Sequence, residues 1–156
     1  MKSRKYGLLL LTMALLTALT ACYRQTLYHH YEPTPLSGWE RSDTLLFTVD
    51  KAKERAVVQR DLELRVTSAY PFQSIHLVIE QTTLPSRIYR RDTISCRLTT
   101  PDGRITGDGI NLYQYRFPLS DISVNEGDSL CFHIHHDMRR EIIQGITDVG
   151  IRLTAY

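Results

Sequence analysis

Seven segments of this chain alternate apolar and polar residues with a period of two, and this pattern constrains the fold more than any other feature. Successive side chains of a β-strand point to opposite faces, so such a segment buries one face and leaves the other in solvent. The segments are 43–49, 61–68, 74–82, 91–99, 110–117, 128–136 and 147–156. Gly, Pro and Asp turns separate them. They predict an all-β fold, a single antiparallel β-sandwich of about seven strands, immunoglobulin-like or jelly-roll-like.

The first 21 residues have the features of a secretory signal peptide. Lys2, Arg4 and Lys5 precede an uncharged, apolar stretch from Gly7 to Leu19. At about 13 residues, this stretch is shorter than the roughly 20 that a helix needs to span a hydrocarbon core. A basic start, a short apolar stretch and small residues before a break predict a cleaved signal peptide over residues 1–21.

The signal peptide ends in Leu19-Thr20-Ala21-Cys22, which resembles the lipobox of bacterial lipoproteins. In those proteins the cysteine becomes the first residue of the mature chain and carries a diacylglycerol and an N-acyl chain such as palmitate. One acyl chain holds a protein to a bilayer only marginally, whereas two or three anchor it durably. We therefore expect a covalent lipid on Cys22, anchorage in a membrane, and no other cofactor.

The rest of the chain is long enough for one domain with a core of its own. Residues 22–38 show no sustained period and are interrupted by Pro33 and Pro35, so we expect a short tether there. The sandwich domain follows over residues 39–156. Within it, residues 136–145 can hold a helical turn that ends at Gly145.

Charge argues against one class of partner. The full chain has 19 basic and 17 acidic residues, but residues 1–21 contain three of the basic ones and no acidic one. The mature chain therefore has 16 basic and 17 acidic residues, a net charge of −1. Nucleic-acid-binding proteins concentrate positive charge on one face, so no nucleic acid is expected as a partner.

Two cysteines remain in the expected domain. Cys96 alternates with apolar residues and is expected to face the core, whereas Cys131 shares a strand face with His133 and His135. An exported compartment permits a disulfide between Cys96 and Cys131. The alternative is two unpaired, largely unreactive thiols.

The same strand face carries the candidate metal ligands. Cys131, His133 and His135 follow one another at steps of about 7 Å along one face. Two imidazoles and a thiolate suit zinc or copper. No fourth ligand can be named from the sequence, so a solvated strand face is the simpler interpretation and no metal is expected.

A Gly-rich loop contains Asp102 and Asp108 in the sequence PDGRITGDG. Carboxylates in a flexible loop can bind calcium, but the spacing differs from that of an EF-hand. The simpler interpretation is a pair of Asp-Gly turns, in which Gly103 and Gly109 adopt positive φ.

An aromatic stripe follows that loop. Tyr113, Tyr115 and Phe117, together with Trp39, can form a platform for sugar rings. The alternative is the buried face of a strand, with tyrosine hydroxyls that reach polar partners at the edge of the core.

No enzyme is predicted. The sequence lacks a G-x-S-x-G nucleophile elbow, and no cysteine has a recognised catalytic base beside it. His29 and His30 fall in the expected tether, where no precisely held active site is expected.

Several segments together resemble the gliding-motility lipoprotein H (GldH) family of Bacteroidetes. They are the lipobox with Cys22, then GWERSDTLLF, YPFQSIHLVIE and TTPDGRITGDG, and last HDMRREIIQGITDVGIRL, which is the most specific. Ile105 departs from the pattern, because a larger aromatic residue is expected there. The resemblance covers nearly all of the mature chain in the expected order.

The closing motif has a structural content. Arg139 and Asp148 can form a charge pair that braces the last loop against the last strand, or they can be two separately solvated charges. Gly150 inside a strand indicates a bulge or a close approach of another group.

The resemblance implies a cell-envelope lipoprotein associated with the gliding machinery and the linked type IX secretion system. We expect a non-enzymatic assembly or stabilising factor that contacts other envelope proteins, its oligomeric state being open. Tyr23 rather than Asp follows the lipidated cysteine, and no acidic run follows. This favours the periplasmic face of the outer membrane, with the inner membrane second. The alternatives are a glycan- or peptidoglycan-binding module and a metal-handling lipoprotein.

Overall fold

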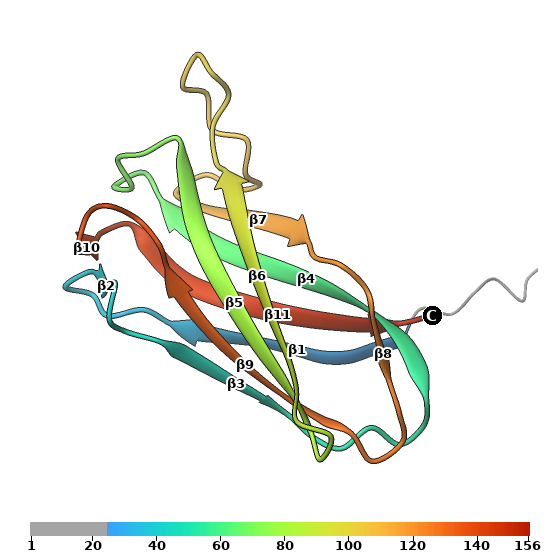
Figure 1. Ribbon diagram of the computed structural model, residues 1–156. Helices are drawn as coiled ribbons and strands as arrows, with labels where there is room; N and C mark the ends of the chain where they lie inside the picture. The colour runs from blue at the N-terminus through green and yellow to red at the C-terminus, as the bar shows by residue number, and fades with distance from the viewer. Residues whose placement is uncertain (1–24) are drawn as a thin grey trace, which may run out of the picture.

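The computed structural model describes residues 25–156, and within them every regular element is a β-strand (Figure 1). The strands are β1 (Gln25–Pro33), β2 (Trp39–Glu40), β3 (Leu45–Val49), β4 (Ala56–Thr67), β5 (Ser74–Leu84), β6 (Ile88–Arg97), β7 (Leu112–Pro118), β8 (Ile122–Val124), β9 (Ser129–His136), β10 (Ile142–Ile143) and β11 (Ile146–Ala155). The predicted all-β class is confirmed. Within the described residues, no helix is long and apolar enough to cross a membrane.

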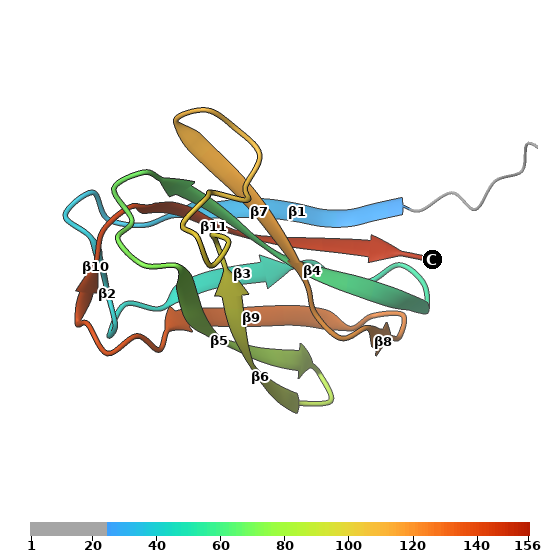
Figure 2. The ribbon, with the colours of Figure 1, turned by 90° about the horizontal axis from the view of Figure 1, so that it is seen from above.

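Two antiparallel sheets form the sandwich (Figure 2). The first has the order β1-β11-β4-β7, and β8 also pairs with β4. The second has the order β3-β9-β5-β6, and the short strands β10 and β2 pair separately. The seven predicted segments correspond to β3, β4, β5, β6, β7, β9 and β11.

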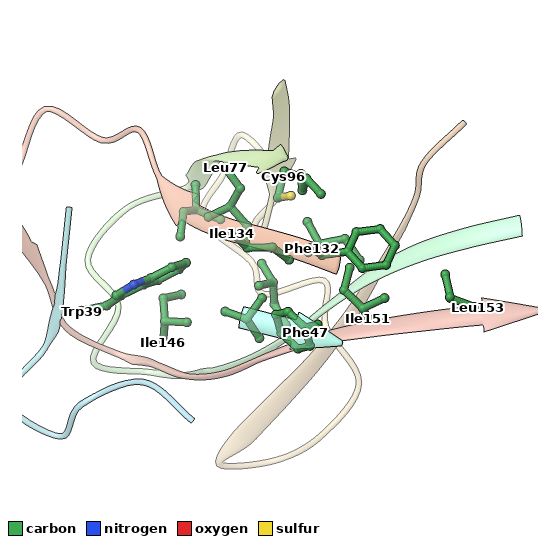
Figure 3. Packing of buried hydrophobic residues seen from close by; sticks show 14 of the residues in the cluster. Trp39, Phe47, Leu77, Cys96, Phe132, Ile134, Ile146, Ile151 and Leu153 are labelled. Carbon is green, nitrogen blue, oxygen red and sulfur yellow. The ribbon is translucent and has the colours of Figure 1, made fainter. Parts of the chain in front are cut away.

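The core lies between the inner faces of the two sheets (Figure 3). Phe47, Phe132, Ile134 and Ile151 are each at most 1% exposed. Each such side chain contributes roughly 1.5–3 kcal/mol when it leaves water. The period-two alternation therefore works as expected: one face of each strand supplies the core.

Part of the expected tether is strand. Residues 25–33 form β1, which pairs with β11 along its length, so the tether prediction is wrong for these residues. The register shifts between Thr26 and Tyr28, and aromatic or histidine side chains occupy both faces, which hides the alternation. The signal peptide and Cys22 lie outside the described residues.

The expected helical turn over residues 136–145 is also wrong. Ile142 and Ile143 pair instead with Glu40 and Trp39 in a two-stranded ladder. This pairing satisfies backbone groups that a helical turn would have bonded internally. Gly145 has a φ of +90°, so a glycine is required there for a turn that is not helical.

One charged side chain lies inside the sandwich. Arg60 of β4 is fully buried, and its guanidinium donates to Gln81 Oε1 of β5 at 2.9 Å and to Asp92 Oδ2 of β6 at 2.8 Å. It also donates to the carbonyl and the hydroxyl of Ser120, both at 2.8 Å. Arg60 thus links the first sheet to the second through hydrogen bonds.

Candidate functional site

The aromatic stripe and the Gly-rich loop, expected separately, meet at one end of the sandwich. They line a pocket of about 300 Å³ together with the β4–β5 connection. We call it the distal pocket because it lies at the end of β4 opposite the start of β1. Its lining residues are Val66, Thr67, Ser68, Tyr70, Pro71, Phe72, Gln73, Leu98, Thr99, Gly103, Ile105, Tyr113 and Tyr115.

Two of the pocket tyrosines pack closely against glycines, which have no side chain to keep them apart. A Cβ at Gly107 would lie 2.6 Å from Cζ of Tyr115, and a Cβ at Gly145 would lie 2.3 Å from the backbone N of Tyr70. Tyr115 Oη donates to the Leu98 carbonyl at 2.9 Å, and Tyr70 Oη donates to the Ser74 carbonyl at 2.9 Å. Burial raises the pKa of both tyrosines. The pocket walls are therefore fixed by close packing and internal hydrogen bonds.

The polar groups of the pocket are neutral. Thr99 has a buried hydroxyl with no hydrogen-bond partner, and the Gln73 amide has only a long contact of 3.5 Å to the Pro101 carbonyl. Phe72 packs edge-on against Tyr70 with ring centroids 5.6 Å apart. The pocket thus combines aromatic surface with hydrogen-bonding groups that are not fully used.

Trp39 does not belong to this aromatic surface. It is fully buried in the core, and its Nε1 donates to the Asp43 carbonyl at 3.0 Å. His136 packs edge-on against it at 5.3 Å, and burial lowers the pKa of His136. Phe117 stacks on Tyr115 at 6.2 Å and is half-buried. The expected platform is therefore wrong for Trp39.

The two aspartates of the Gly-rich loop occupy turns. Gly103 and Gly109 have φ values of +86° and +138°, as the turn interpretation requires. Asp102 is exposed, and hydrogen bonds, first from Thr100, lower its pKa. Asp108 pairs through its backbone with Gln114 of β7.

A larger pocket of about 380 Å³ lies at the opposite end, where β1 begins. Gln25 and Tyr28 line it, and so do charged residues of the β3–β4 connection, among them Lys51 and Lys53. Charge therefore distinguishes the two ends of the sandwich.

The candidate metal ligands are only partly brought together. Cys131 Sγ lies 3.6 Å from His133 Nε2 on the outer face of β9. His135 follows on the same face, half-exposed. In residues 25–156 no group of three His, Cys, Asp or Glu side chains could hold a metal ion.

Cys96 and Cys131 are both free. Cys96 lies opposite Ile75 of β5 and Cys131 opposite Thr82, a separation of about 23 Å along that strand. Cys96 faces the core, as expected, and burial raises its pKa to about 12. The candidate disulfide is therefore wrong on distance and direction, and the thiols are unpaired.

Of the two features expected in the closing motif, the structure contains one. Arg139 and Asp148 make no ion pair in the described part of the chain, and Asp148 instead accepts a hydrogen bond from Thr147 at 2.8 Å. The charge-pair interpretation is wrong. Gly150 does allow a close approach, because a Cβ there would lie 2.7 Å from the ring of Tyr31.

This close approach leads to a group of residues that sequence reasoning missed. Glu63 of β4 is 2% exposed although it lies on the outer face of its sheet. Its carboxylate accepts hydrogen bonds from Tyr31 Oη, from His29 Nε2 at 2.7 Å and from Arg116 Nε at 2.7 Å. Burial alone would raise the pKa of Glu63, but these bonds outweigh it and lower the pKa. We call these four residues the Glu63 cluster.

The strand register explains the cluster. Tyr31, Gly150, Glu63 and Arg116 lie opposite one another across four neighbouring strands. Because Gly150 has no side chain, the Tyr31 ring crosses β11 and reaches Glu63. Arg65 places its guanidinium 3.9 Å from the centre of the Tyr31 ring. Burial and the Glu63 hydrogen bond raise the pKa of Tyr31 to about 12.

The amino-acid sequence gives little indication of the Glu63 cluster. His29 and Tyr31 lie on one face of β1 and Tyr28 and His30 on the other, so hydropathy does not alternate. Gly150, noted in advance as the sign of a close approach, was the one usable indication.

These features define the class: a β-sandwich domain whose candidate sites are one uncharged pocket and the surfaces of its sheets. The chain belongs to the GldH lipoprotein family, whose model matches residues 26–153. The match confirms the resemblance described in the sequence analysis. The chain is 25% identical to the gliding motility lipoprotein GldH of Flavobacterium johnsoniae over 98% of both chains.

Solved structures show only distant likeness. An aminopeptidase of a Thaumarchaeota archaeon is 10% identical, with a TM-score of 0.41, over 87% of this chain and 33% of its own. Dimeric latent PorU of Porphyromonas gingivalis is 8% identical, with a TM-score of 0.36, over 86% of this chain and 14% of its own. The chain thus spans a third or less of these proteins, and no functional argument follows from them.

Proposed function

We propose that this gliding-motility lipoprotein is a non-enzymatic assembly or stabilising factor, held by lipid on Cys22 and acting through contacts with other envelope proteins. The protein is anchored on the periplasmic face of the outer membrane, and its partners belong to the gliding and type IX secretion machinery. Membership of a lipoprotein family and the lipobox support the anchor.

The short distance between anchor and domain supports contact at the membrane. β1 begins at Gln25, three residues after Cys22. Three residues span at most about 11 Å. A lipid on Cys22 would therefore hold the end of the sandwich where β1 begins close to the bilayer. The distal pocket would face away from it, about 26 Å farther along β4 between Val58 and Val66.

The observation that carries the proposal is the open edge of β6. β6 is the last strand in the order β3-β9-β5-β6, and ten residues present that edge. Tyr89 and Ile88 are more than half exposed, and Arg90, Arg91 and Arg97 are exposed too. An unpaired edge is a template for another strand. The arginines favour an extended acidic segment as the added strand.

Photocrosslinking in the native host tests this. A benzoylphenylalanine in place of Tyr89 should crosslink to an envelope protein, and crosslinking should fall when Cys22→Ala removes the anchor. The matched control places the same group at Gln114, exposed on β7 at the edge of the other sheet. Equal crosslinking from both positions, or from Gln114 alone, would overturn the assignment to β6.

A further inference from the structure

We propose that the distal pocket binds a sugar ring of an envelope glycan, a neutral or N-acetylated saccharide. This goes beyond the proposed contacts with proteins, which use the edge of β6. The two surfaces belong to different parts of the molecule, so either can fail without the other.

The first argument is the absence of charge in the pocket. None of its thirteen lining residues is Asp, Glu, Lys, Arg or His, in a chain in which 23% of residues are charged. The pocket at the other end is lined by Asp50, Lys51, Lys53, Glu54 and Asp128. A phosphate or a carboxylate would find no countercharge in the distal pocket, so its ligand is neutral.

The second argument is the mixture of surfaces. Phe72, Tyr113 and Tyr115 supply aromatic rings, and Tyr70 supports Phe72 from its edge. The C–H face of a sugar packs on such rings, while its hydroxyls and amide need hydrogen-bonding groups beside them. Ser68 and Gln73 provide these at the exposed margin.

The third argument is rigidity. Tyr70 and Tyr115 already donate their hydroxyls to backbone carbonyls, and Gly145 and Gly107 let the neighbouring chain pack against them. A ligand therefore need not order these rings when it binds, and this lowers the entropic cost of binding. A neutral ligand such as a sugar gains no attraction between opposite charges, so it benefits from a pocket formed in advance.

The position fits an envelope glycan. The pocket lies at the end of the sandwich away from the start of β1, so an anchor on Cys22 leaves it open to the space beyond the membrane. This step rests on the proposed anchor, but binding of the sugar itself does not.

The test is saturation-transfer NMR with the mature lipoprotein in lipid nanodiscs. The probes are the trisaccharide of N-acetylglucosamine, maltotriose, and an apolar peptide of three leucines. We expect transfer to a sugar, with affinity about tenfold weaker in Tyr113→Ala and in Gln73→Ala. The matched control is Tyr156→Ala, an exposed tyrosine beside Val57 at the other end of β4, which should bind the sugar as the unchanged protein does.

Gln73→Ala also guards against loss of folding, because Gln73 is exposed, its side chain makes only one long hydrogen bond, and its backbone hydrogen bonds to Leu98 and Thr99 are kept. Affinity unchanged in both pocket variants would overturn the proposal. So would transfer to the peptide with none to either sugar, which would assign the pocket to a protein segment. Failure here leaves crosslinking from position 89 untouched, so the two proposals are judged separately.

Discussion

Arg60 and Glu63 lie three residues apart on β4, and both are buried, but on opposite faces of the sheet. Arg60 is inside the sandwich and bonds to Gln81 and Asp92 of the second sheet. Glu63 is outside and bonds to side chains of β1 and β7 in its own sheet. Arg60 therefore links the two sheets of the sandwich, whereas Glu63 links the edge strands β1 and β7 to β4 within one sheet.

The two charges also differ in chemistry. Arg60 carries a guanidinium, a group that proteins do not deprotonate. The carboxylate of Glu63 can be neutralised by acid. The comparison therefore predicts that the contribution of Glu63 to stability depends on pH.

The largest expected effect is that of Arg60→Ala. It removes a fully buried charge and leaves Gln81 without its donor, so the free energy of unfolding should fall by about 3–5 kcal/mol. Denaturant unfolding of the mature chain measures it. Arg97→Ala, an exposed arginine on β6, is the control and should change stability by less than about 0.5 kcal/mol. Equal effects of the two variants would refute the linking role of Arg60.

The second effect is that of Glu63→Gln, which keeps the shape and removes the charge. It weakens three hydrogen bonds, two of them to partly exposed partners, so we expect a loss of about 2 kcal/mol at neutral pH. Glu54→Gln, exposed in the β3–β4 connection, is the control. A loss no greater than that of Glu54→Gln would mean that the cluster adds nothing to stability.

The third expected effect is a loss of stability in acid due to Glu63. It is smaller than the effect of Glu63→Gln, because acid removes the charge of Glu63 but leaves its oxygens in place. The folded pKa of Glu63 lies below its ordinary value of 4.5. The unfolded chain therefore binds the proton more readily, and the stability due to Glu63 is full above pH 4.5 and falls as the pH drops through the folded pKa. The difference between the unchanged protein and Glu63→Gln should shrink over that range.

His136 also makes the folded protein less stable as the pH falls, but it does so at a higher pH than Glu63. Burial lowers its pKa below 6.5, so protonation destabilises the fold as the pH falls below that value. This contribution is common to both proteins and cancels in their difference. A difference between the two proteins that stays constant below pH 4.5 would contradict the pH dependence assigned to Glu63.

The alternation of residues was enough to predict the strands that supply the core. Phe47, Ile134 and Ile151 are buried where the period places them, because burial of one strand face is a local property of the sequence. The same pattern did not predict that Arg60 is buried, because a charged residue at a position that faces the core breaks the alternation. Its burial depends on Gln81 and Asp92, more than 20 residues away.

The site was predictable in pieces. The Gly-rich loop and the aromatic stripe were recognised, and each lines the distal pocket through Gly103 and Tyr113. Their meeting depends on the β4–β5 connection, which carries Tyr70 and Phe72 and has no alternation of its own. Trp39 was misplaced for a related reason: its surroundings are set by pairing with Ile143, 104 positions further along the chain.

The smallest effect is that of Tyr31→Phe, which removes one hydroxyl from the Glu63 cluster and keeps the ring over Gly150. One hydrogen bond contributes about 1 kcal/mol, and the contact of the ring with Arg65 remains. A double-mutant cycle with Glu63→Gln measures whether the two groups act together: the double variant should lose less than the sum of the single losses. Strict additivity would show that Tyr31 stabilises β1 by packing alone, and that on the outer face only His29 still ties β1 to the buried carboxylate.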